Sequence, residues 1–205
     1  MSELFSIQLQ NRQQQGRDGV WLDLPTTTEQ VQAALRQIGI SSDNPQGLFI
    51  SGYFAEEEKR FAIPYNMVLA SSVDELNFLA ARLETLSAGE RAELNAALQA
   101  PQSELSSIGR IIDFPENVDY YVHLPDVRGP AQLGDYYLNR SGMVDMPEEW
   151  KGGIDTAQFG RYVAQQEQGA FTQYGYLVKS GDEWQKVHEG QPVPEEYRVL
   201  SFPAP

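Results

Sequence analysis

The chain has 205 residues, of which 41% are hydrophobic and 21% are charged, so it can bury a core. It carries 29 acidic and 15 basic side chains, a formal net charge of −14, and no cysteine. These figures exclude disulfides, thiolate nucleophiles and cysteine–zinc sites, and the charge disfavours direct binding to nucleic acid or to an anionic membrane. Without a signal-peptide pattern or an apolar run of about 18 residues, we expect a cytoplasmic protein.

The first region, residues 1–67, is predicted to be a small β-sheet with one helix laid on it. Apolar and polar residues alternate over residues 4–9, which indicates a strand, and Val20–Leu24 is a second strand that ends before a proline. Gly47–Phe54 reads as a third strand. Arg60–Tyr65 is expected to be an edge strand, because it contains a proline.

A helix is predicted between the second and third of these strands. Thr26 is a good N-cap, and Glu29 stands three residues later, as in a capping box. Gly39 supplies the C-terminal stop. One face of this helix is apolar and consists of Val31, Leu35 and Ile38.

The second region, residues 68–110, is predicted to be helical. Two capping boxes, Ser72 with Glu75 and Ser87 with Glu90, each precede apolar residues at helical spacing. Pro101 breaks the helical run. A third helix is expected to be lined by Leu105, Ile108 and Ile112.

The third region, residues 111–179, is predicted to be an α+β domain. Its expected strands are Val118–Leu124 and Phe171–Val178. Three helix starts are predicted between them: at Pro130, at Asp145 with Glu148, and at Asp155 with Gln158, the last helix facing inward through Phe159, Tyr162 and Val163.

Residues 180–205 form a polar, proline-containing C-terminal extension. We therefore expect an α+β fold, with small antiparallel sheet domains flanking a small helical bundle. Units of about 40–70 residues are only marginally stable by themselves, so we expect the parts to be stabilised by packing against one another or against a second subunit.

Motifs for phosphate, dinucleotide or serine-hydrolase chemistry are absent from the sequence. The two histidines, His123 and His188, stand outside any metal-binding spacing, and a structural role is favoured for them. We predict no catalytic residues, no metal and no cofactor. Acidic side chains are abundant, so a carboxylate-based hydrolase stays open as an alternative.

The distribution of acidic residues is the most informative pattern. Residues 74–155 contain fifteen acidic side chains against six basic ones, whereas residues 1–52 contain five against three. Because B-DNA carries one charge per roughly 1.7 Å, a net charge of −14 matches about seven base pairs. The carboxylates predicted to contact a basic partner are Asp113, Glu116, Asp119, Asp126, Asp135, Asp145, Glu148, Glu149 and Asp155.

Several short motifs in order resemble the ArdA-type antirestriction proteins over about residues 4–178. The first region carries Trp21-Leu22-Asp23-Leu24-Pro25, Thr28-Glu29, Ile38-Gly39 and then Phe49-Ile50 with Tyr53. The third region carries Ile154-Asp155-x-Ala157-x-Phe159-Gly160-Arg161, then Gly169-x-Phe171 and Tyr174-Gly175-Tyr176.

This resemblance implies a three-domain, elongated, curved homodimer from a mobile genetic element that acts inside a bacterial host cell. Such proteins mimic bent B-form DNA and occupy the groove in which type I restriction-modification enzymes, through their methyltransferase core, bind DNA. The alternative is an acidic adaptor that binds another basic or nucleic-acid-binding protein through one local patch.

Overall fold

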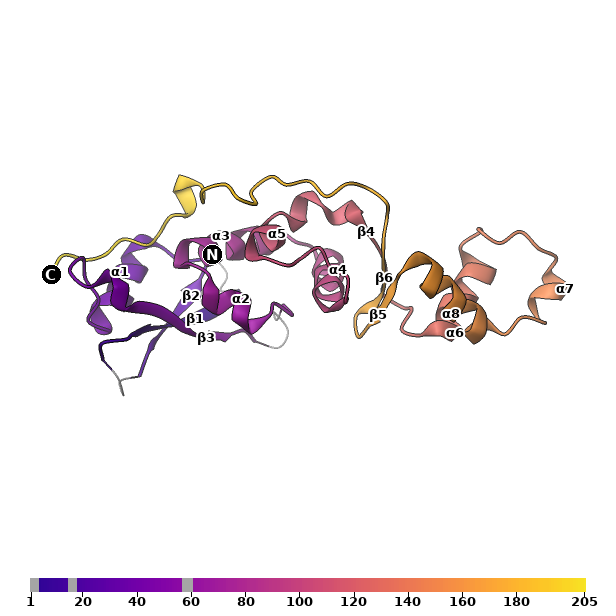
Figure 1. Cartoon of the computed structure of the whole chain (residues 1–205), viewed down its shortest axis with the longest axis horizontal. Helices are drawn as coiled ribbons and strands as arrows, with labels where there is room; N and C mark the ends of the chain where they lie inside the picture. The colour runs from indigo at the N-terminus through magenta and orange to yellow at the C-terminus, as the bar shows by residue number, and fades with distance from the viewer. Residues whose placement is uncertain (1–3, 15–17, 57–60) are drawn as a thin grey trace. The chain divides into compact units, whose positions relative to one another are not determined.

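The computed structural model describes residues 4–14, 18–56 and 61–205, which form two compact units (Figure 1). Unit 1 combines residues 1–86, 105–116 and 186–205, and unit 2 combines residues 87–104 and 117–185. Each unit contains a three-stranded antiparallel sheet with helices, which confirms the predicted α+β class. The division into four consecutive parts stays a prediction. None of the helices in the described ranges is long and apolar enough to cross a membrane.

The sheet of unit 1 has the strand order β2-β1-β3. Its strands are β1 (Phe5–Asn11), β2 (Val20–Leu24) and β3 (Leu48–Phe54). Alternation along β1 directs Ile7 and Leu9 into the core, where both are fully buried. The three strands predicted here are confirmed.

Helix α1 (Thr28–Gln37) starts one residue later than predicted, because Thr27 rather than Thr26 is its N-cap. Thr27 and Gln30 form the capping box. Thr26 contacts a different helix instead, because its backbone N–H donates a hydrogen bond to the Asn77 side chain at 2.7 Å. The predicted stop at Gly39 is confirmed by its φ of +68°, which glycine adopts without strain.

The predicted edge strand at 60–65 is wrong over its described part. Arg60 lies outside the described residues, residues 61–64 are not part of a strand, and helix α2 (Tyr65–Ala70) begins directly after Pro64. Phe61 and Ile63 are buried, so the apolar alternation here reflects packing into the core rather than a strand.

Helix α3 (Val73–Glu84) is the central helix of unit 1 and packs against β2 and α5 (Ile108–Ile112). Its capping box joins Ser72 and Glu75, as predicted. Leu76, Leu79 and Leu83 are fully buried along one face.

Unit 2 contains α4 (Ala88–Gln99) and a sheet of order β4-β6-β5. The strands are β4 (Tyr121–Leu124), β5 (Ala170–Thr172) and β6 (Gly175–Lys179). The Ser87 capping box and the end of α4 before Pro101 are confirmed. The predicted strand at 118–124 is shorter, because residues 118–120 form a 3-10 turn.

The single strand predicted at 171–178 is wrong, because this stretch is a hairpin of β5 and β6. Thr172 Oγ1 accepts a hydrogen bond from the Tyr174 N–H at 3.1 Å, which closes the turn. Gly175 has a φ of +131°, and a Cβ there would lie 2.5 Å from the Leu124 carbonyl oxygen. The turn therefore depends on a glycine that a periodicity argument ignores.

The helices after β4 are α6 (Pro130–Asp135), α7 (Glu148–Lys151) and α8 (Thr156–Glu167). Asp155 caps α8 as predicted, accepting a hydrogen bond from the Gln158 N–H at 3.0 Å. The predicted cap at Asp145 is wrong, because α7 follows Pro147 and has no side-chain cap. Tyr162 was expected to face inward but is 59% exposed, whereas Phe159 and Val163 are half-buried.

Helices α6 and α8 cross at two glycines. A Cβ on Gly134 would lie 1.9 Å from the Thr156 carbonyl oxygen, and one on Gly160 would lie 1.8 Å from the Pro130 carbonyl oxygen. These neighbours are backbone atoms that cannot move without shifting a whole helix, so only glycine permits this crossing.

We predict that Gly160→Ala lowers the free energy of unfolding by about 2 kcal/mol or more, because the added methyl forces the two helices apart. Urea unfolding of the full chain measures it. Gly152→Ala is the matched control: nothing lies within 4 Å of its Cβ position, and the expected change is under about 0.5 kcal/mol. Equal effects of the two substitutions would contradict the close crossing.

Candidate partner-binding surface

The nine carboxylates predicted to contact a partner divide between the two units. Asp113 and Glu116 belong to unit 1, and the other seven belong to unit 2. Their surroundings differ enough to separate them into a buried anchor, ion-paired groups, and outward groups that have no ion pair with another described residue.

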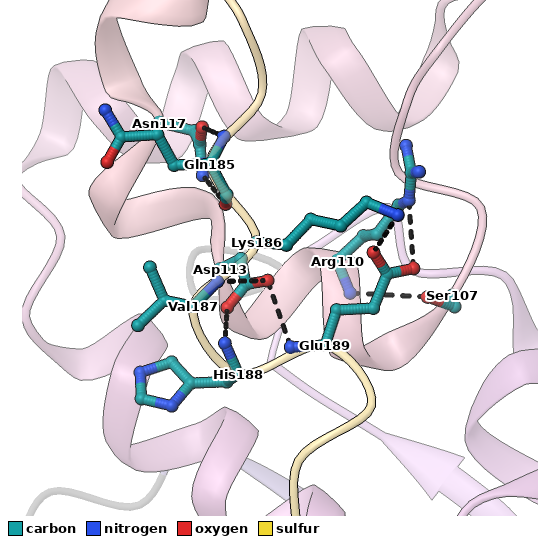
Figure 2. A network of polar contacts seen from close by, with 9 residues as sticks. All are labelled: Ser107, Arg110, Asp113, Asn117, Gln185, Lys186, Val187, His188 and Glu189. Atoms are coloured by element: carbon teal, nitrogen blue, oxygen red, sulfur yellow. Dashed lines mark hydrogen bonds and ion pairs between the residues drawn. The ribbon is translucent and has the colours of Figure 1, made fainter.

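Asp113 is the buried anchor, and its predicted surface role is wrong. Its side chain is fully buried and accepts hydrogen bonds from the backbone N–H groups of Val187, His188 and Glu189, at 3.3, 2.6 and 3.1 Å (Figure 2). Three donors replace the water that a buried carboxylate loses. The carboxylate is therefore used inside unit 1 and is closed to a partner.

Three of the predicted carboxylates are engaged in ion pairs. Glu116 pairs with Arg82. Asp135 pairs with Arg140 at 3.1 Å, and Glu148 pairs with Lys151 at 2.6 Å. A partner's cation would have to compete with these neighbours, so each pair offers less net attraction than an isolated carboxylate.

Four predicted carboxylates of unit 2 point to solvent. They are exposed and form no ion pair with another described residue: Asp119, Asp126, Asp145 and Glu149. Asp155 is exposed as well, although it also caps α8. Such groups keep their hydration in the free protein and are available to lysine or arginine side chains of another molecule.

Glu93 of α4 is an acidic group whose special environment the sequence did not indicate. One of its carboxylate oxygens is buried without a hydrogen-bond partner. Burial, together with the negative charges of Glu90 and Asp119, raises the pKa of Glu93 to about 8. At pH 7 this side chain is mostly protonated, so it adds little to the negative field of unit 2.

Glu167, at the end of α8, accepts hydrogen bonds from two tyrosine hydroxyls. Tyr176 donates to it at 2.9 Å, and Tyr137 donates to the other carboxylate oxygen. Burial raises the pKa of both tyrosines, and the bonds to the Glu167 carboxylate raise them further. The three side chains fix the end of α8 against the sheet.

A cavity of about 350 Å³ lies beside Glu167 in unit 2 and is lined mainly by apolar atoms of the sheet, including Phe171 and Leu177. Glu167 is the single acid among its described lining residues. A carboxylate-based hydrolase needs two acids facing each other across a cleft, and this cavity does not offer them.

The histidines are structural within their units. His123 Nε2 lies 2.9 Å from the Tyr174 carbonyl oxygen, and the His188 ring lies edge-on to Phe78. In the part of the chain that the structure describes, no cluster of three or more histidine, aspartate or glutamate side chains could hold a metal ion.

The chain is similar to a known protein family. The family model described as antirestriction protein (ArdA) matches residues 15–178, which is most of the chain. No curated protein matches the chain significantly. The match ends before residues 186–205, which belong to unit 1.

Glu93 gives a testable pH dependence. Its pKa is about 8 in the folded protein and 4.5 as the ordinary value, so folding favours the protonated form. The resulting stabilisation is complete below pH 4.5 and is lost as the pH rises to about 8.

We predict that Glu93→Gln flattens the fall in unfolding free energy between about pH 5 and pH 8, because glutamine cannot ionise. Glu149→Gln is the control, since Glu149 is exposed, and its curve should run parallel to that of the unchanged protein. Denaturant unfolding at several pH values measures the unfolding free energy of the unchanged protein and of both variants. A Glu93→Gln curve as steep as the unchanged one would show that Glu93 ionises normally.

Proposed function

The chain belongs to the ArdA family of antirestriction proteins, and we propose that it acts as a mimic of B-form DNA that blocks type I restriction-modification enzymes. Family membership implies an antirestriction function exerted on restriction enzymes, in a family of inhibitors rather than catalysts. The finer proposal is that the carboxylates take the place of DNA phosphates in the DNA-binding groove of the methyltransferase core.

The observation that supports this proposal is the set of outward carboxylates in unit 2: Asp119, Asp126, Asp145 and Glu149. Unit 2 contains thirteen acidic and six basic residues, so its field is strongly negative even with Glu93 neutral. A groove rich in lysine and arginine binds phosphates mainly through charge, and it attracts exposed carboxylates by the same interaction.

The proposed active form is an elongated homodimer, since two copies double the charge that one copy presents. The alternative, an acidic adaptor, places the binding energy in one local cluster. The outward carboxylates come from separate segments, namely the turn before β4, the loop after β4 and the stretch around α7. This spread favours distributed mimicry over a single patch.

We predict that the protein displaces a labelled DNA site from a type I restriction-modification enzyme, measured by fluorescence anisotropy of the DNA. Its own affinity for the enzyme, titrated without DNA, should fall as salt rises from about 50 to 200 mM. If the DNA stays bound at every ratio of protein to enzyme, the type I restriction-modification enzyme is not the target.

We also predict that neutralising outward carboxylates gives a graded loss. Asp126→Asn and Glu149→Gln should each weaken binding to the enzyme by less than about tenfold, and the double substitution should weaken it by about the product of the two factors. Titration of the enzyme with each variant checks this. Loss of all binding from one of these substitutions would favour the adaptor.

A further inference from the structure

Residues 186–205 return to unit 1 and lie outside the stretch that matches the ArdA family. In Figure 1 this segment is the yellow C-terminal stretch that runs beside the helices of unit 1. Its one short helical piece is a 3-10 turn at Glu195–Tyr197, and it joins no described strand. The segment therefore depends for its conformation on the surface to which it is bound.

The first attachment is at Asp113, directly after α5. One carboxylate accepts hydrogen bonds from three consecutive backbone N–H groups, those of residues 187–189 (Figure 2). The Glu189 side chain adds an ion pair with Arg110 at 3.1 Å, and within the segment it pairs with Lys186 at 3.3 Å. The backbone is thus held by a fully buried charge, which is a costly group to leave without donors.

The second attachment is at Asp74, in the first turn of α3. Its Oδ1 accepts hydrogen bonds from the N–H groups of Val199 and Leu200 at 2.8 and 2.7 Å. One turn later, the Asn77 side chain donates to the Tyr197 carbonyl oxygen at 3.0 Å. Val199 is buried, so this attachment combines backbone recognition with a side chain in the core.

The third attachment is aromatic and joins the other two. Phe78 of α3 is buried and contacts His188 edge-on, with ring centroids 5.0 Å apart. Its ring also contacts Tyr197, with centroids 4.6 Å apart. One buried ring therefore receives side chains from both halves of the segment.

The segment is less tightly packed between its attachments. A cavity of about 300 Å³ is lined by residues of α3 and α5 and by Gly190, Gln191, Pro192 and Val193. Gly190 has a φ of +78°, as expected of a turn that glycine favours. Main-chain hydrogen bonds on both sides of this stretch resemble the way in which a binding groove holds an extended peptide.

We propose that unit 1 carries a peptide-binding groove, formed by α3 and α5, whose ligand is the chain's own residues 186–205. Recognition uses the carboxylates of Asp113 and Asp74 for backbone N–H groups and the Phe78 ring for His188 and Tyr197. The segment is a separable ligand: with its covalent link cut, it stays bound as long as the two carboxylates are present.

The test uses the full chain with a specific protease site inserted after Gly181, a glycine with nothing within 4 Å of its Cβ position. The folded protein is cut, and native mass spectrometry and size exclusion at micromolar concentration follow the C-terminal fragment. We expect it to remain bound. Fragment that leaves the otherwise unchanged protein would overturn the proposal.

The same cut is made in a variant with Asp113→Asn and Asp74→Ala, from which the fragment should dissociate at least about tenfold faster. Asp43→Asn, an exposed carboxylate of unit 1, is the matched control and should retain the fragment. The fragment also keeps Trp184 and Gln185, which contact Tyr120 and Asn117 within unit 2. Equal retention by all variants would therefore show that other contacts hold it, and the groove would be rejected.

Hydrogen exchange on the uncut Asp113→Asn protein covers the case in which the double variant does not fold. The amides of residues 187–189 should exchange at least about tenfold faster, because an asparagine nitrogen then faces donors that need an acceptor. The amides of β1 should keep their rates. Unchanged exchange at 187–189 would contradict recognition by Asp113.

Discussion

The hydrogen bond from a backbone N–H group to a carboxylate is the interaction on which much of this structure depends. Glu75 and Glu90 use it in capping boxes, and Asp155 uses it to start α8. Asp113 and Asp74 use it over a long range to hold the C-terminal segment. Although the chain has a formal charge of −14, some of its acidic side chains therefore serve as hydrogen-bond acceptors within the protein itself. Each such bond satisfies donors that would otherwise need water, and it removes a carboxylate from those available to a partner.

The function proposed here depends on the carboxylates that remain outside. These exposed carboxylates destabilise the free protein only slightly, because they stay hydrated and their mutual repulsion is screened by salt. Binding to a basic groove releases the ions held by both surfaces, as it does when the groove binds DNA. Net charge is therefore a poor measure of the contact surface: Asp113 is internal, Glu93 is mostly neutral at pH 7, and Glu116, Asp135 and Glu148 have basic neighbours.

The local part of the fold could be predicted from the sequence. The capping boxes at Ser72 and Ser87 and the cap at Asp155 were found, because each joins residues three apart along the chain. The fold class and the first three strands followed from periodicity. The predicted cap at Asp145 was wrong. Asp145 and Glu148 have the spacing of a cap, but the helix here starts directly after Pro147.

The remaining errors concern contacts between distant residues or glycine conformations. Asp113 meets backbone groups 74–76 residues later, and no spacing rule reports such a partner. The hairpin at 170–179 turns at a glycine with positive φ inside a run that otherwise reads as one strand. Phe61 and Ile63 alternate with polar or small residues as in a strand, but they are buried in the core outside any strand. The family resemblance was confirmed over residues 15–178, because it rests on the order of several motifs.

The division of acids into internal and outward groups can be measured directly by carbodiimide labelling of carboxylates, read by mass spectrometry with and without the restriction-modification enzyme. In the free protein, Asp119, Asp126, Asp145 and Glu149 should be labelled readily and Asp113 should not. Adding the enzyme should protect the outward groups. Labelling of these four carboxylates that is unchanged by the enzyme, or Asp113 that labels as fast as they do, would contradict the division on which the proposed mimicry depends.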